Sequence, residues 1–487
     1  MTKEAHNNSE QRPKEFNKWW AILGIGIGIF IFSLDIYIVN LALPLMVSSL
    51  NTSFSTIQWI VLSYLVTLSV SVLSIAKLGD VFSKKHLYII GIIIFTISSL
   101  LCGISPNINC LIIFRALQGL GAAFIAGLGT AMIVEVFPKE QRGLGLGIRA
   151  AIFGLGIMLG PTIGGILISW GGWPLIFLVN VPIGIICSLL VAYLVPPSYI
   201  SNKKHSFDII GTLFFTVTLT CFTLGITLLQ NQTISFNTAI TLLIISLISM
   251  MIFLFIEANV LEPMLDLKIF QSLEISMGLL LRFLGNFVIA GVIFMLPFFL
   301  ELVKHYPSEQ VGLLLSIDPI LIVIVAPFAG SLSDWFGPRI ISLIGLLFIA
   351  SGCWLIGTFD TKLTLIHYIC CVIPFGLGVG IFQSPNNSLV MGSTPKDQLG
   401  IASGLLALSR MLGQMLGVPI VGALFFFITN ANANLSPNID ITEAPIEALV
   451  IGTQTTFRIV AIVLIMLTTF AALFWRFDKN NQTSITN

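Results

Sequence analysis

The 487-residue sequence has few charged residues: Asp, Glu, Lys and Arg make up only 9% of it, and the formal net charge is +1. Soluble domains carry roughly 25% charged residues, so this chain cannot build an ordinary water-soluble surface. The nearly neutral charge gives no sign of a nucleic-acid partner. The seven cysteines follow no zinc or disulfide spacing, and we interpret them as small apolar packing residues.

Long apolar runs take the place of the missing charge, with 56% hydrophobic residues and a mean hydropathy of +1.00. A transmembrane helix needs about 20 apolar residues, because the hydrocarbon layer is about 30 Å thick and each residue advances about 1.5 Å. The sequence therefore predicts an all-α membrane protein with fourteen transmembrane helices and both termini on one side. The runs begin near Trp19, Thr56, His86, Asn109, Leu144, Trp173, Phe207, Phe236, Glu274, Glu309, Ile340, Thr364, Leu399 and Thr453.

The basic residues between these runs predict the orientation. Nearly all of them fall on the side of the termini, and only Lys304 and Lys362 fall on the opposite side. Because Lys and Arg are retained on the cytoplasmic side, we expect a multi-pass protein of the cytoplasmic membrane with both termini in the cytoplasm.

One segment of the chain is repeated. AKLGDVFSKK at residues 76–85 recurs as GSLSDWFGPR at residues 330–339, after the second and the tenth run respectively. The chain therefore reads as two related halves with extra helices between them, a recurrent plan among transporters. The predicted division is a cytoplasmic tail at 1–18, a six-helix bundle at 19–200, two linker helices at 201–260, a second six-helix bundle at 261–475 and a cytoplasmic tail at 476–487.

The repeated segment resembles the signature loop of the major facilitator superfamily, G-x-L-x-D-R-x-G-R-R. The charged positions that match are Asp80, Lys84 and Lys85 in the first copy and Asp334 and Arg339 in the second. The first copy lacks the family's basic residue directly after its Asp. A carboxylate there can cap a neighbouring helix or pair with cations, so we expect a conformational latch; a solvated loop is the alternative.

The first run contains LDIYIVNLALP at residues 34–44, similar to the L-D-x-T-x-V-N-x-A-L-P motif of fourteen-helix drug:proton antiporters, with Tyr37 at the family's Thr. Asp35 and Asn40 are the polar residues of this motif. A bare charge inside a span costs a few kcal/mol or more, so Asp35 is expected to face the interior and to exchange protons. The alternative is an Asp that serves helix packing.

The fourth run contains Arg115, Gln118 and Gly119 in an element that resembles the superfamily's R-x-x-Q-G-x-x-A-A. Their spacing places them, with Ala122, on one helix face. Arg115 remains charged at every accessible pH. We therefore expect Arg115 to tune a nearby carboxylate, Asp35 first, unless its role is purely structural.

The fifth run contains the sequence GIMLGPTIGG, which resembles the G-x-x-x-G-P-x-x-G-G antiporter motif. Its motif residues are Gly156, Gly160, Pro161, Gly164 and Gly165. Glycine at every fourth position makes a smooth groove for a neighbouring helix, and proline removes a backbone hydrogen bond so that the helix can bend. These properties predict a gate, with static packing as the alternative.

Other ionisable residues lie in apolar runs: Asp318, Arg149, Arg282, Arg410 and Arg458. Intramembrane charge is a functional hypothesis by default. Asp318 is the second candidate for proton or cation contact, although the following proline could simply mark a kink. Arg282 is a further candidate for substrate contact. The buried arginines outnumber the buried acids, which argues against a strongly cationic substrate.

The resemblance implies two six-helix bundles with two additional central helices, alternating access, and export of drugs or other hydrophobic or amphiphilic small molecules in exchange for protons. A dedicated exporter of one metabolite, siderophore or lipid-like compound is the alternative. A membrane enzyme is disfavoured, because the sequence has no H-E-x-x-H motif and no phosphate-binding loop. We expect no cofactor and no metal; the expected partners are a small-molecule substrate, protons and the lipid bilayer, with a monomer as the working unit.

Overall fold

The computed structural model describes residues 18–138, 141–196, 209–229, 236–260, 270–394, 399–433 and 440–485. Over these residues the chain is helical and contains no strand. Fourteen segments are long and apolar enough to cross a membrane. The predicted all-α, fourteen-helix membrane fold is therefore confirmed.

The spans follow the chain in simple order, and three of them are built from two helical pieces each: α6 with α7, α10 with the π-helical turn η3, and α11 with α12. The elements are α1 (Lys18–Ser49), α2 (Phe54–Val81), α3 (Lys84–Gly103), α4 (Ile108–Val136), α5 (Arg142–Gly171), α6 (Pro174–Leu178), α7 (Asn180–Leu194), α8 (Ile209–Leu229), α9 (Phe236–Asn259), α10 (Leu273–Phe298), η3 (Phe299–Val303), α11 (Ser308–Leu315), α12 (Ile317–Phe336), α13 (Pro338–Ile356), α14 (Leu365–Gly392), α15 (Leu399–Ala433), the short turn η4 (Ile441–Glu443) and α16 (Ile446–Ile485).

The last span begins earlier than the sequence predicts. All other predicted starts lie within three residues of the observed ones, but the fourteenth span starts at Ile446 and not near Thr453. The carbonyl of Pro445 accepts hydrogen bonds from the amides of Ala448 and Leu449 and so opens the helix there. The acidic residue in this first turn interrupts the apolar run and hides the start.

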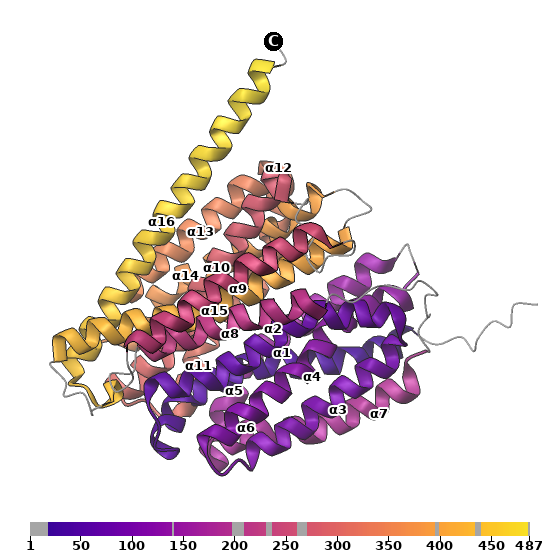
Figure 1. Cartoon of the computed structure of the whole chain (residues 1–487). Helices are drawn as coiled ribbons and strands as arrows, with labels where there is room; N and C mark the ends of the chain where they lie inside the picture. The colour runs from indigo at the N-terminus through magenta and orange to yellow at the C-terminus, as the bar shows by residue number, and fades with distance from the viewer. Residues whose placement is uncertain are drawn as a thin grey trace, which may run out of the picture.

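The helices pack as two groups, which we call the amino-terminal half (α1–α7) and the carboxy-terminal half (α10–α16). In the first, α4 packs against α2 and α3, and α1 against α5 and α7; in the second, α14 packs against α12 and α13, and α10 against α15. The two groups are visible as the indigo-to-magenta and the rose-to-yellow parts of Figure 1. The residue limits of the two six-helix bundles stay a prediction.

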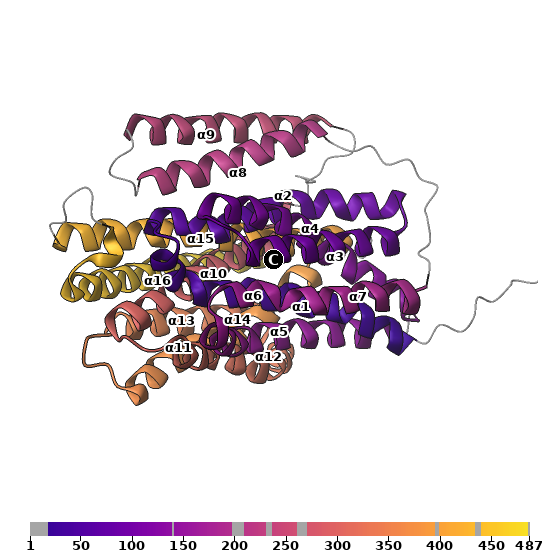
Figure 2. The ribbon, with the colours of Figure 1, turned by 90° about the horizontal axis from the view of Figure 1, so that it is seen from below.

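Helices α8 and α9 are central in the sequence but peripheral in space. They pack against each other, and α8 also contacts α2 and α15. Figure 2 shows the pair on one side of the molecule, outside both halves. The indole of Trp59 donates a hydrogen bond of 3.1 Å to Thr227, which ties α8 to α2. The expectation that these helices are central is therefore correct only for their place in the chain.

The two halves meet at the end of the bundle that is predicted to face outside. At the start of α2, the ring of Phe54 lies 5.1–5.7 Å from the rings of Phe294, Phe298 and Phe425 of the other half. The amide of Phe54 also donates to a carboxylate oxygen of Asp440 at 2.9 Å. Towards the opposite end the ribbons of the two halves diverge (Figure 1). This conformation is therefore closed at the predicted outer end.

Candidate functional site

A buried ion pair joins α1 to α4. Asp35 is 0% exposed and Arg115 is 1% exposed, and 2.7 Å separates a guanidinium nitrogen of Arg115 from a carboxylate oxygen of Asp35. The Nε of Arg115 donates to the backbone carbonyl of Ile60 at 2.9 Å. Two charges this deeply buried depend on each other, because either one alone would be uncompensated.

Amide side chains complete the shell around this pair. Gln118 donates to Asp35 at 3.0 Å and accepts from Arg115 at 2.6 Å, and Asn180 of α7 donates to Asp35 at 3.2 Å. The guanidinium of Arg115 also lies over the ring of Tyr64, 4.2 Å from its centroid. Both carboxylate oxygens of Asp35 are thus occupied, and α1, α4 and α7 are held together at one point.

The sequence predicts part of this network and misses the rest. The pairing of Asp35 with Arg115 and the shared face of Arg115 and Gln118 are present as expected. The sequence analysis does not single out Asn180 or Tyr64. The one available signal is the amide of Asn180 inside an otherwise apolar run.

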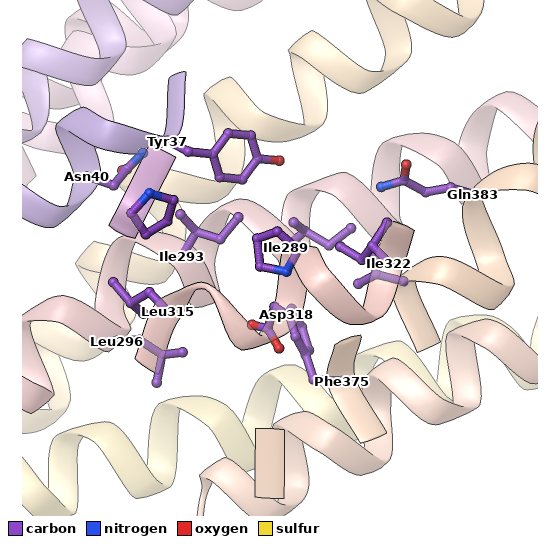
Figure 3. A pocket seen from close by; sticks show the side chains of 13 residues that line it. Tyr37, Asn40, Ile289, Ile293, Leu296, Leu315, Asp318, Ile322, Phe375 and Gln383 are labelled. Atoms are coloured by element: carbon purple, nitrogen blue, oxygen red, sulfur yellow. The ribbon is translucent and has the colours of Figure 1, made fainter. Parts of the chain in front are cut away.

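A pocket lies between the two halves near the middle of the bundle. The amino-terminal half contributes Tyr37, Asn40 and Pro161, and the other half contributes mainly apolar side chains together with Asp318. Figure 3 shows Tyr37 and Asn40 on one side of the space and Asp318 and Phe375 on the other. The free space between these side chains is about 30 Å³, so the pocket is narrow in this conformation.

Asp318 differs from Asp35 in having no counter-charge among the residues that the structure describes. It is 7% exposed, and in the part of the chain that the structure describes its Oδ1 has no hydrogen-bond partner. Its neighbours in the pocket include Ile289, Ile322 and Phe375. Burying an unpaired carboxylate is costly, and binding a proton or a donor group from a ligand removes that cost. Asp318 is therefore the acid of this pocket that is free to react.

A second lobe of the pocket leads towards the ion pair. Tyr37, Asn40 and Ile293 line both lobes, and the second lobe is also lined by Arg115 and Gln414. Asn40 itself donates to the carbonyl of Ile36, one turn earlier in α1, and not to the Asp35 network. Two adjoining spaces that share these three residues therefore touch the two candidate regions, one Asp318 directly and the other Asp35 through Arg115.

The glycine motif of α5 packs against α1. A Cβ atom added at Gly156 would collide with Ser33, one at Gly160 would lie 3.2 Å from the Cβ of Tyr37, and one at Gly164 would lie 2.7 Å from Ile38. The smooth groove that the motif predicts is therefore occupied by α1. The pocket residue Tyr37 lies directly on it.

The end of the same motif touches the other half. A Cβ atom added at Gly165 would lie 2.7 Å from the carbonyl oxygen of Ser308 at the start of α11, and one added at Gly312 would collide with the carbonyl of Pro161. The hydroxyls of Thr162 and Ser316 are 2.6 Å apart. The motif thus forms a close contact between the halves at the closed end, which is where a gate would act.

The first copy of the repeated loop ties three helices together. Lys84 forms an ion pair of 2.8 Å with Glu135 near the end of α4. Lys85 donates to the carbonyls of Ala192 and Val195 at 2.7 Å each, at the end of α7. A cation at a helix C-terminus pairs with the last carbonyls and with the helix dipole. The side chain of Asp80 lies outside the described residues.

The second copy forms a different contact from the one that the motif suggests. Asp334 is exposed, and Arg339 pairs with Glu274 at the start of α10. Ser393, just after α14, donates to the same carboxylate. The cation of the repeat is therefore held by a carboxylate from another helix and not by Asp334. The loop sequence alone could not predict this pairing, because Glu274 lies about 60 residues away in the sequence.

Arg282 lies apart from the Asp35 network. It is 7% exposed on α10, and Asn286, one turn later, donates to its backbone carbonyl. None of the hydrogen bonds and ion pairs that hold Asp35 and Arg115 involves Arg282. Its role in substrate contact stays a prediction.

A fourteen-span helical bundle with two packed halves and a pocket between them is the architecture of a membrane transporter. The comparisons with known proteins agree with this class. The family model of the Major Facilitator Superfamily matches residues 25–418, and the chain belongs to that family. The fold and the family are those of transporters and not of enzymes.

Several relatives are similar over most of their length. The riboflavin transporter RibZ of Clostridioides difficile is 34% identical, over 84% of this chain and 88% of the relative. The multidrug resistance protein Stp of Mycobacterium tuberculosis is 28% identical over 86% and 78%, and the multidrug transporter protein MdtP of Bacillus subtilis is 27% identical over 84% and 76%. These relatives thus include a multidrug resistance protein, a multidrug transporter and a riboflavin transporter.

Solved structures support the fold alone. A bacterial homologue of the human lysosomal transporter Spinster, in an inward-facing conformation, superposes with a TM-score of 0.68 at 16% identity, over 95% of this chain and 97% of that one. The xylose transporter XylE from Escherichia coli gives a TM-score of 0.60 at 17% identity, over 94% and 99%.

Proposed function

We propose that this protein is a proton-coupled antiporter that exports amphiphilic small molecules, drugs among them, across the cytoplasmic membrane. In this proposal the termini lie in the cytoplasm, and the pocket around Tyr37 opens to each side in turn. The observation that carries the proposal is Asp318, a buried carboxyl group in a mostly apolar pocket between the halves, with no counter-charge within the described ranges of the chain.

The two acids have separate roles in this proposal. Asp318 binds a proton when the pocket is empty and gives it up when substrate and water change its surroundings. Asp35, held by Arg115, Gln118 and Asn180, responds to protonation by loosening the contact between α1 and α4. Because α1 also lies in the glycine groove of α5, movement of α1 would reach the contact between Gly165 and α11.

The energetics allow such a cycle. Each tenfold difference in proton concentration is worth about 1.4 kcal/mol, and moving one charge through 100 mV is worth about 2.3 kcal/mol. One proton entering the cell under a modest gradient can therefore concentrate a solute on the outside by more than tenfold.

The test is transport in proteoliposomes with an imposed pH gradient and a library of amphiphilic dyes and drugs. We expect dye movement that requires the gradient, and proton release when substrate is added to the protein in detergent. Asp318→Asn is expected to abolish gradient-driven transport while binding persists. The matched control is Asp360→Asn, an exposed acid in the loop between α13 and α14, which should transport normally.

Full gradient-driven transport by Asp318→Asn would overturn the role of Asp318. Transport that ignores the pH gradient in the unaltered protein would overturn proton coupling itself.

A second candidate is dedicated transport of riboflavin or a closely related heteroaromatic compound. The observation that favours it is the 34% identity with RibZ. The pocket, which has Tyr37, Tyr64 and Phe375 around its lobes, offers aromatic surfaces on which a flat ring system can stack. Saturable transport of riboflavin, without transport of the dye library, would select this candidate over the first.

A further inference from the structure

We propose that the substrate is an amphiphilic organic anion, and that its carboxylate or phosphate group is held by three arginines, Arg149, Arg282 and Arg410. We call these residues the arginine cluster. This inference deepens the proposed export function and rests on it. The three come from α5, α10 and α15, so the cluster is shared by both halves.

Two residues of the arginine cluster, Arg410 and Arg282, lie on helix faces that line the pocket. Arg410 is one turn before Gln414 and two turns before Val418, which line the second lobe. Arg282 is two turns before Ile289 and Ala290, which line the first and second lobes. Residues separated by four and by seven or eight positions share one face of a helix. Both side chains therefore stand on the faces that lead into the pocket.

The three arginines are neighbours in space as well. The guanidinium of Arg410 lies over the ring of Phe153 of α5, 4.9 Å from its centroid, and Arg149 is one turn before Phe153. The charge of Arg410 acts on both Arg149 and Arg282, and the charges of Arg282 and Arg410 both act on Tyr37. Tyr37 is the residue common to both lobes, so the cluster lies next to the centre of the pocket.

Several nitrogen atoms of the cluster are buried without an acceptor. Arg282 is 7% exposed, and among the described residues its Nε and Nη1 have no hydrogen-bond partner. Arg149 and Arg410 are partly exposed, and their buried Nε atoms also lack a partner among these residues. Among the carboxylates that the structure describes, none forms an ion pair with these three. Arg115, by contrast, donates from Nε and Nη1 to the carbonyl of Ile60, to Asp35 and to Gln118.

An anionic oxygen group supplies what is missing. Guanidinium groups remain charged at every accessible pH and match carboxylate and phosphate oxygens with paired hydrogen bonds. Three fixed cations against the single acid Asp318 repel a cationic substrate and attract an anionic one. Each of the three lies in the first half of a span that begins at the predicted cytoplasmic end, so the cluster would collect the anion before export.

The direction of transport also favours an anion. A membrane potential that is negative inside drives an anion outward with about 2.3 kcal/mol per charge for each 100 mV. A proton that enters and an anion that leaves both make the inside of the cell more positive. The membrane potential and the proton gradient therefore drive the same cycle.

The experiment measures binding of four pyrene probes to the full-length protein in nanodiscs by fluorescence. The probes share one body and differ in the end group: 1-pyrenebutyrate, pyrenebutyl phosphate, neutral 1-pyrenebutanol and a pyrenebutyl-trimethylammonium cation. We expect one or both anions to bind at least tenfold more tightly than the alcohol, and the cation more weakly than the alcohol. The stronger of the two anions identifies the group as carboxylate or phosphate.

Substitutions then test the cluster itself. Arg282→Gln and Arg410→Gln are each expected to weaken anion binding by roughly tenfold or more and to leave binding of the alcohol within about twofold. Arg282→Lys should restore part of the anion preference. The matched control is Arg458→Gln, an exposed arginine of α16 beside Gly357, which should bind all probes as the unaltered protein does.

Three results would each overturn the inference: tightest binding of the trimethylammonium probe, equal binding of all probes, or an anion preference that survives both glutamine substitutions. Transport of neutral or cationic probes in proteoliposomes would then leave the exporter proposal standing alone. Conversely, tight anion binding without any transport would support the arginine cluster and refute the proposed function.

Discussion

Replacing Asp35 by asparagine should destabilise the protein as well as stop coupled transport, because the substitution leaves Arg115 charged and buried. Breaking a buried pair by removing one partner costs about 3–5 kcal/mol. In this structure Arg115 would keep the carbonyl of Ile60, the amide oxygen of Gln118 and the ring of Tyr64. The cost is therefore expected near the lower end, at about 3 kcal/mol.

A double substitution separates charge from shape. Arg115→Gln alone leaves Asp35 buried with donors only from Gln118 and Asn180, so it should also destabilise the protein. Asp35→Asn with Arg115→Gln removes both charges at nearly constant volume, and the loss of stability should be clearly smaller than the sum of the two single losses. All four proteins would be compared by thermal unfolding in one detergent at one scan rate, since such unfolding is often irreversible.

Additive losses in this cycle would refute the argument that the pair is held together by mutual charge compensation. Asp360→Asn, at an exposed acid, gives the baseline for removing a carboxylate and should leave the unfolding midpoint unchanged.

Three further predictions concern the gate, a helix end and the driving force. Gly165→Leu should stop transport, because its side chain would meet the start of α11 at Ser308 and hold the outer end open; Gly147→Leu on the same helix, where no atom lies within 4 Å of an added Cβ, should transport normally. Lys85→Gln removes two hydrogen bonds to the last turn of α7 and should cost about 0.3–1 kcal/mol, seen as faster amide hydrogen exchange confined to that turn. Transport of an anionic probe should accelerate when valinomycin and a potassium gradient make the side of the termini electrically negative, because that potential drives anions away from that side. A transport rate that does not respond to the potential would contradict net charge movement.

Much of the fold follows from the sequence because membrane spans obey a local rule. Each helix needs only an apolar run of sufficient length, and the run identifies it without knowledge of its neighbours. The exception is instructive: α16 starts at Ile446 because Pro445 offers its carbonyl, a detail that an apolar-run criterion does not register. The peripheral position of α8 and α9 depends on contacts with α2 and α15, which no local pattern encodes.

The site could be predicted only where its residues sit in short motifs. Asp35, Arg115 and Gln118 were found because a charge or an amide in an apolar run is conspicuous and because their spacing defines one face. Asn180 and Glu274 were missed as partners because the residues that they bind lie more than 60 positions away. The isolation of Asp318 and of the arginine cluster could not be foreseen either, since lack of a partner is a property of the whole packing.

The most direct test of the account follows the two ends of the bundle by spin-label distance measurements in nanodiscs, on a cysteine-free background. One label pair would join Leu144 of α5 to Trp335 of α12, both exposed at the end where the halves diverge, and a second pair would join the exposed residues Trp170 of α5 and Leu313 of α11 at the closed end. Alternating access predicts that substrate and pH shift the populations so that one distance shortens as the other lengthens. Distances that remain single and unchanged under every condition, or that change together in the same sense, would contradict transport through the pocket between the halves.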